Sequence, residues 1–294
     1  MVTAAFLLVA ALGAPHQQAQ ARAADTDQTV AVARGARLTV DNFGGDVVVR
    51  IWPRDEVRVR ANHGRRAKVI VATTPAGVVV RADQSAPGSV DYQISMPAWM
   101  SVRVSGTYAF IDIEAGEGEV VAETTRGDVV VKGGSGTVTA KSIMGDVVIE
   151  NARGRVTASS VNEGVRLAGV SGDIIVESSN GDIQMMNVRA TSIDASTING
   201  DITFDGPPAD RGRYRFATHN GDIVADVPPA SSITFHVRSY QGRLLTTLEL
   251  QGPPRSEVQR GRRTTFTLGS GSAEMELETF GGTIRIGPPK GVHP

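Results

Sequence analysis

Residues 127–149 read GDVVVKGGSGTVTAKSIMGDVVI and contain three copies of one short phrase, a glycine followed by about five residues of alternating character. Further copies are GRVTAS from residue 154, GDIIVE from 172, GDIQMM from 181 and GDITFD from 200. The glycines follow one another at steps of 9, 9, 9, 9, 10, 8 and 9 residues: Gly118, Gly127, Gly136, Gly145, Gly154, Gly164, Gly172 and Gly181. Such a fixed period is typical of a repeat protein.

Two positions of each phrase are apolar, the second and the fourth residue after the glycine. Val129 and Val131 occupy them in one copy, and Ile183 and Met185 in another. Residues two apart in a strand point to the same face of the sheet. The residue between them varies in polarity, as expected at a position that faces solvent. Each unit therefore predicts a short strand followed by a turn.

A five-residue strand with two inward side chains cannot form a core alone, so successive units must stack on one another. Two nine-residue units per coil give about 18 residues, and equivalent side chains then recur about 4.7–4.9 Å apart along the stack. The sequence therefore predicts an all-β fold, a right-handed parallel β-solenoid or β-helix. The right hand follows the general preference of parallel crossover connections.

The glycines are predicted to lie at the corners of the coils. The structural turn residues expected there are Gly127, Gly145, Gly172, Gly181, Gly200 and Gly221. The pairs Asn180-Gly181, Asn199-Gly200 and Asn220-Gly221 are expected to supply positive φ angles. The Asp that follows most of the glycines is expected to fold its carboxylate back onto N–H groups of its own turn.

The nine-residue step does not extend over the whole chain. Residues 24–110 alternate well but lack it, which predicts an irregular N-terminal β region that caps the stack or begins it with wider coils. Residues 111–290 form the predicted repeat domain. Within it the step lengthens to 21 residues after Gly200, where Pro207-Pro208 marks a longer corner.

Residues 1–23 are predicted to be a signal peptide. A short apolar run from Ala4 to Ala14 is followed by polar and small residues that end in Ala21-Arg22-Ala23, an A-x-A cleavage pattern. The run is too short to cross a bilayer, which takes about 20 residues, and no later segment reaches that length. The expected location is the periplasm, the cell surface or the extracellular space.

Composition disfavours several classes of function. Thirty basic and 31 acidic side chains give a net charge of −1, so nothing points to a nucleic-acid partner. The absence of cysteine excludes disulfides, thiolate metal sites and a thiol nucleophile. No phosphate-binding or dinucleotide fingerprint is present, and no cofactor or catalytic residue is predicted.

One candidate site is a column of acidic residues that recur about every two units: Asp128, Asp146, Glu163, Asp182, Asp201 and Asp222. In a solenoid they would line one edge, where like charges one coil apart repel and a divalent cation such as calcium would relieve the repulsion. The favoured alternative is that each carboxylate caps its own turn and is solvated. The nonapeptide calcium repeat G-G-x-G-x-D is absent.

The chain resembles the candidate-adhesin β-strand-repeat family of bacteria, a family of largely unknown function. The resemblance rests on the opening phrase VDNFGGDVVV, on Met96-Pro97-Ala98-Trp99-Met100 before a strand, and on the tandem G-D-V/I units. It covers roughly residues 29–286 and implies the solenoid fold, but it provides no catalytic residues to transfer.

The expected function is therefore a non-enzymatic exported protein that presents an extended surface for adhesion or envelope structure. Its partner is unknown, with a cell-surface or glycan ligand as the candidate. One alternative is an envelope scaffold that associates with itself end to end. The other is a polysaccharide-binding or polysaccharide-lyase-like β-helix, which needs clustered acids and a nearby basic residue.

Overall fold

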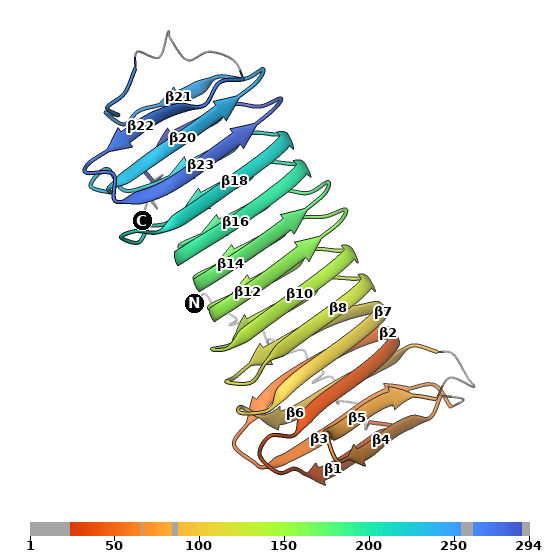
Figure 1. Ribbon diagram of the computed structural model, residues 1–294. Coiled ribbons are helices and arrows are strands. Elements are labelled where there is room, and N and C mark those ends of the chain that lie inside the picture. The colour runs from red at the N-terminus through yellow and green to blue at the C-terminus, as the bar shows by residue number, and fades with distance from the viewer. Residues whose placement is uncertain (1–23, 66, 84–87, 254–260, 290–294) are drawn as a thin grey trace, which may run out of the picture.

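The computed structural model describes residues 24–65, 67–83, 88–253 and 261–289 (Figure 1). Every regular secondary-structure element in these ranges is a β-strand. The strands lie across a long stack with the N-terminal strands at one end and the C-terminal strands at the other. No helix in the described ranges could span a membrane. The predicted signal peptide, residues 1–23, lies outside the described residues.

The middle of the stack is built from coils of two strands, one in each of two facing layers. The first layer contains β8 (Val120–Arg126), β10 (Thr137–Met144), β12 (Arg153–Ser160), β14 (Ser171–Ser178), β16 (Arg189–Asn199) and β18 (Arg213–Asn220). The second layer contains β9 (Val129–Gly133), β11 (Val147–Glu150), β13 (Val165–Ala168), β15 (Ile183–Met186), β17 (Ile202–Asp205) and β19 (Ile223–Asp226).

Each of these strands pairs in parallel with the equivalent strand one coil away. Val120, Val138, Val156 and Ile174 lie side by side, so the coil is 18 residues long. The predicted parallel β-solenoid is confirmed. The step then becomes 19 residues at Ile193, because β16 has a bulge opposite Gly172/Asp173, and 21 residues at the following coil.

The interior of the stack is thin and apolar. Each strand buries alternate residues, so Val138 and Ala140 of β10 face Val147 and Ile149 of β11 across the core. Larger side chains fill the wider coils, where the ring of Phe204 lies with its centroid 5.3 Å from that of Phe216. Coil length and side-chain volume therefore increase together, as close packing requires.

At the N-terminal end the order of coils in space differs from their order in sequence. β2 (Arg37–Trp52) and β7 (Ser101–Ala115) each run through both layers and pair with each other. β5 (Gly77–Ala82) and β6 (Val90–Pro97) pair with the other side of β2. β4 (Val69–Thr74), β3 (Glu56–His63) and β1 (Thr26–Ala31) then add antiparallel.

The C-terminal end has a similar exchange. β20 (Ile233–Ser239) and β21 (Leu244–Thr246) form the outermost coil, while the last strands, β23 (Ala273–Thr279) and β24 (Ile284–Gly287), insert between that coil and β18/β19. β22 (Thr264–Leu268) adds antiparallel to β20. At the N-terminal end, β7 already pairs with β8 at the 18-residue step, as Val102 with Val120 shows, and the antiparallel strands lie beyond β5 and β6.

Candidate functional site

The candidate site lies on the corner where each first-layer strand passes into its second-layer partner. This corner, residues 125–128, 143–146, 161–164, 179–182, 198–201 and 219–222, is called the ladder corner below. It follows the ends of β8, β10, β12, β14, β16 and β18 along one side of the stack (Figure 1). Equivalent residues of successive coils therefore form columns along this side.

The first column is glycine, for a reason other than the predicted one. The expected positive φ at the pairs Asn180-Gly181, Asn199-Gly200 and Asn220-Gly221 was wrong, because neither residue of any pair has a positive φ. A Cβ on Gly145 would lie 2.1 Å from the carbonyl oxygen of Gly127. Glycine is needed because neighbouring backbones approach closely.

The predicted turn glycines divide between the two corners of the coil. A Cβ on Gly181, Gly200 or Gly221 would likewise lie only 1.9 to 2.3 Å from a backbone oxygen. Gly127 combines such a collision with a φ of 125°. Gly172 pairs with Gly154 and therefore lies on the opposite corner, where its φ is 117°. Positive φ thus explains the need for glycine at only some of the predicted turn positions, Gly127 and Gly172.

A second column consists of buried hydroxyl groups, which the sequence analysis did not identify. Ser160 Oγ donates a hydrogen bond to the carbonyl oxygen of Gly145 at 3.0 Å and accepts one from the N–H of Glu163 at 3.2 Å. The equivalent hydroxyls donate in the same way: Thr124, Ser142, Ser178, Thr197, Thr218 and Thr279. Each hydroxyl thus provides a hydrogen-bond donor for a backbone carbonyl of the corner.

A third column contains the predicted acidic residues. The expectation that each carboxylate folds onto its own turn was wrong. Asp128 Oδ1 accepts the N–H of Asp146 in the next coil at 2.9 Å, and Asp182 Oδ1 accepts the N–H of Asp201 at 2.8 Å. Asp222 reaches Thr283 of β24's coil in the same way. The carboxylates therefore link coils, and each such bond is charge-assisted.

An asparagine ladder runs beside the acidic column. The side-chain amide of Asn180 donates to Asn162 Oδ1 at 3.2 Å, Asn199 donates to Asn180 at 3.0 Å, and Asn220 donates to Asn199 at 2.9 Å. These side chains are exposed, and they give the ladder corner a continuous polar row. A repeated row of one side chain is a direct consequence of stacking in register.

Glu163 does not belong to the acidic column. Val165 pairs with Val147 and with Ile183, so Gly164 is the residue that lies between Asp146 and Asp182. Glu163 occupies the glycine position instead. The repeat reads Asn-Glu-Gly at residues 162–164, whereas residues 180–182 read Asn-Gly-Asp. The column is therefore interrupted at one coil by a residue without a side chain.

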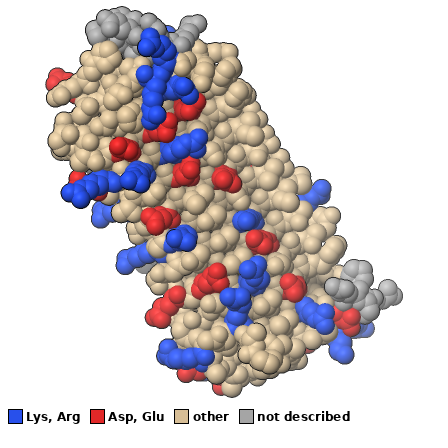
Figure 2. Space-filling model, in the orientation of Figure 1, with Lys and Arg blue, Asp and Glu red and all other residues tan. Residues whose placement is uncertain are grey.

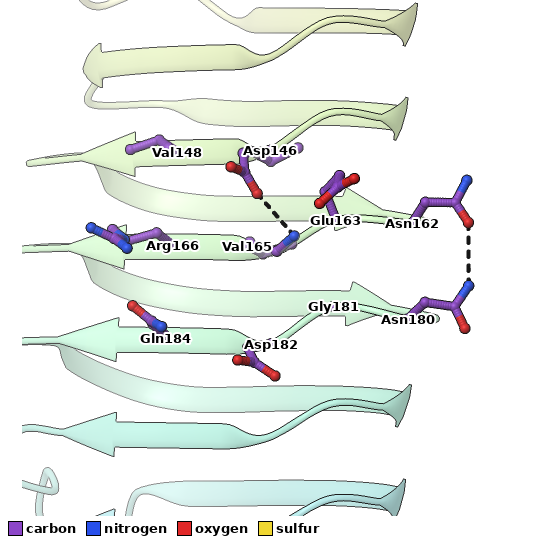
Figure 3. Close-up of a pocket in the computed structure, with 12 residues that line it drawn as sticks. Asp146, Val148, Asn162, Glu163, Val165, Arg166, Asn180, Gly181, Asp182 and Gln184 are labelled. Atoms are coloured by element: carbon purple, nitrogen blue, oxygen red, sulfur yellow. Dashed lines mark hydrogen bonds between the residues drawn. The ribbon is translucent and has the colours of Figure 1, made fainter.

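A hollow of about 570 Å³ lies at this interruption (Figure 3). It is open to solvent, and residues of three coils line it: Asp146, Val147, Val148, Asn162, Glu163, Gly164, Val165, Arg166, Asn180, Gly181, Asp182 and Gln184. Asp146 Oδ1 accepts the N–H of Gly164 at 2.9 Å. The hollow thus combines hydrogen-bond acceptors and donors on one side of an otherwise regular stack.

The charged side chains around the hollow carry both signs. No group of three or more potential metal ligands gathers anywhere in the described ranges. Three carboxylates, of Asp146, Glu163 and Asp182, line the hollow together with the guanidinium of Arg166. The predicted column thus brings five aspartates into register, but their carboxylates mainly satisfy backbone N–H groups of neighbouring coils.

The outer face of the first layer has a different character from the ladder corner. Figure 2 shows Lys and Arg interspersed with Asp and Glu over this face. Arg215 pairs with Asp194 at 3.2 Å, and Arg263 pairs with Glu276 at 3.4 Å. Such exposed pairs contribute little to stability, and the mixture of signs produces no single-sign field for a polyanion.

Two parallel layers, a thin apolar interior and hydrogen-bonded columns along the corner define the protein as a β-solenoid repeat protein. The chain belongs to the Toastrack DUF4097 family, whose model matches residues 36–287. This match extends over the stack from β2 to β24 and confirms the family resemblance seen in the repeats.

The comparisons with curated proteins and with solved structures add no further assignment. No curated protein matches the chain. A candidate adhesin of Bacteroides fragilis is 13% identical with a TM-score of 0.46, over 89% of this chain and 96% of that one. A candidate cell adhesion protein of Clostridium sporogenes is 8% identical with a TM-score of 0.26, over 90% and 99%. The assignment therefore depends on the family match.

Proposed function

We propose that this protein is an exported, non-enzymatic protein of the adhesin type, which binds a cell-surface or glycan ligand through the outside of its coil. The observation that carries the proposal is the ladder corner. Its polar side chains repeat coil after coil on a stiff scaffold, and the hydrogen bonds between coils fix their positions. A rigid, repeated row of donors and acceptors suits recognition of an extended polar partner.

Two further features support the proposal. The sequence of residues 1–23 has the pattern of a signal peptide, which is consistent with export. The aspartate side chains of the ladder corner are hydrogen-bonded to backbone N–H groups, as in Asp128 with Asp146 and Asp201 with Asp222, an arrangement that suits a structural role. A polysaccharide lyase would need acids and a base free to act on substrate.

Adhesion is tested with beads that carry the chain without residues 1–23. Beads coated with the protein should be retained on bacterial or host cell layers under flow, and beads coated with an unrelated protein of similar charge should not. Retention equal to the control on every surface would overturn the proposal. Release of reducing sugar from a bound polysaccharide would instead indicate the lyase-like alternative.

A self-associating scaffold is the second candidate, and one observation favours it. Among the described residues the strand pairing of β21 is with β24, in the outermost coil at the C-terminal end of the stack. Open strand edges are sites where another chain can add. Light scattering after size-exclusion chromatography tests this candidate. A mass that rises with protein concentration is expected for a scaffold, and a concentration-independent monomer excludes it.

A further inference from the structure

We propose that the hollow at Gly164, called the coil notch below, is a binding site for a neutral saccharide unit. The coil notch is the hollow lined by Asp146, Glu163, Arg166, Asp182 and Gln184 together with the neighbouring residues of the same three coils. This inference rests on the proposed function, because it names the ligand class and the place where such a protein would bind it.

The first argument is that one coil in the middle of the stack lacks the Gly-Asp pair of the ladder corner and has Glu163-Gly164 in its place. Residues 162–164 depart from the Asn-Gly-Asp phrase at 180–182, although the strands on both sides keep their register. The departure removes one carboxylate from the column. Natural sequences break a local rule mainly where function requires it.

The second argument is the hydrogen-bonding capacity left in the coil notch. In the regular coils the N–H that follows the glycine is accepted by the Asp of the preceding coil, as with Asp146 and Asp128. Asp182 follows Gly181 in the same way, but the preceding coil has Gly164 there, which has no side chain to accept its N–H. An acceptor oxygen of a ligand could take this place.

The third argument concerns charge and identifies the ligand class. Three carboxylates and one guanidinium surround the coil notch, so an anionic ligand would be repelled. Carboxylates accept hydrogen bonds from hydroxyl groups, while Arg166 and the side-chain amide of Gln184 can donate to hydroxyl or ring oxygens. A compact group with many hydroxyls that both donate and accept, and with no charge, fits this set. Neutral sugars have this chemistry.

The structure also provides a substitution that fills the coil notch. A Cβ on Gly164 would lie 3.2 Å from the carbonyl oxygen of Asp182 and 3.4 Å from Asp146 Oδ1, and its φ is not positive. Small shifts therefore admit Gly164→Asp. The double variant Glu163→Gly with Gly164→Asp restores the regular phrase, and it should form the missing bond to the N–H of Asp182.

The experiment measures binding of fluorescent neutral oligosaccharides, namely glucans, galactans, mannans and xylans, to the chain without residues 1–23. Wild type should bind at least one series, and both variants should bind about tenfold or more weakly while melting at the same or a higher temperature. Thr283→Asp is the matched control, because it adds the same charge farther along the same column, beside Asp222. It should bind like wild type.

Each outcome decides the proposal. Equal binding by wild type and the filled variants would show that the coil notch is not the saccharide site. Bead adhesion is measured separately, so the proposed function could still hold in that case. Failure of wild type to bind any neutral series would overturn the saccharide site as well. If Gly164→Asp does not fold, Arg166→Ala, which changes an outward side chain, must weaken binding. A rise in melting temperature with calcium chloride alone, abolished by Gly164→Asp, would assign the hollow to a cation and overturn the saccharide class.

Discussion

The middle of the stack and its two ends solve the same packing problem in different ways. Between β8 and β17 each coil covers its neighbour, and the columns of glycine, hydroxyl and carboxylate recur almost unchanged. At each end the outermost coil, β5/β6 or β20/β21, pairs with an inserted coil and then with antiparallel strands. Regular coils need only nearest neighbours, whereas an end must also cover exposed core and unpaired strand edges.

The difference also concerns distance along the chain. Neighbouring coils in the middle are 18 residues apart, but β18 pairs with β23, whose residues follow about 61 positions later, as Tyr214 with Met275 shows. Loop closure over a longer segment costs more conformational entropy. We therefore expect the middle to form first and the ends to open first. The predictions below test which interactions make the two parts differ.

The largest effect is expected from a methyl group between coils of the middle. Gly145→Ala should lower the free energy of unfolding by about 3 kcal/mol, because its Cβ would collide with the backbone of Gly127 at 2.1 Å. Gly136→Ala is the matched control on the opposite corner, where the closest atom lies at 3.2 Å. Urea unfolding measures both. Equal losses would show that backbone spacing at the ladder corner is not the constraint.

A smaller effect is expected from the buried hydroxyl column. Ser160→Ala should cost about 2 kcal/mol, because it leaves the carbonyl of Gly145 and the N–H of Glu163 without their partner. Ser159, the preceding residue of the same strand, points outward and is only half-buried, so Ser159→Ala should change the free energy of unfolding little. A loss in Ser159→Ala as large as in Ser160→Ala would contradict this account.

The regular middle could be predicted from the sequence because its signals are local. The spacing of glycines gave the coil length, and the alternation at Val129 and Val131 gave the inward face. The 18-residue spacing of Thr124, Ser142 and Ser160 was equally visible, but hydroxyl residues are common in strands and their burial is evident only after stacking. The right hand of the coil stays a prediction.

The ends could not be predicted, because nothing local distinguishes an inserted coil from an appended one. The phrase at residues 280–286 reads like any other repeat, yet β24 lies between β19 and β21. The acidic column was misassigned at one coil for a related reason. Counting acids every two units selected Glu163, whereas register selects Gly164, and only strand pairing shows the difference of one residue.

In the longer coils toward the C-terminal end, a tyrosine hydroxyl is the hydrogen-bond partner of two backbone groups. Tyr214 Oη donates to the carbonyl oxygen of Ala190 and accepts the N–H of Ala209, both at 2.7 Å. Tyr214→Phe should cost about 1–2 kcal/mol by leaving both groups unpaired. The melting temperature measures this. An unchanged value would show that water replaces the hydroxyl and that the wide coil is not held at this point.

The smallest effect is expected at the N-terminal end, and its sign is opposite. Tyr92 is fully buried, and its hydroxyl has no hydrogen-bond partner among the described residues. Tyr92→Phe removes an unsatisfied polar group, so it should leave stability unchanged or raise it by up to about 1 kcal/mol at neutral pH. A clear loss of stability in this variant would show that the hydroxyl has a partner in solution.

Alkaline pH makes the same tyrosine measurable. Burial raises the pKa of Tyr92 to about 12, above its ordinary value of 10.0. The folded state therefore holds the phenolic proton more tightly than the unfolded state. The stability that results is fully present below pH 10 and is lost as pH rises from 10 to about 12. In Tyr92→Phe the fall in melting temperature over this interval should be smaller, but it should not vanish, because burial also raises the pKa of Tyr214. An identical fall in both proteins would mean that the N-terminal end opens before Tyr92 ionises, which would place the weak point of the stack at this end.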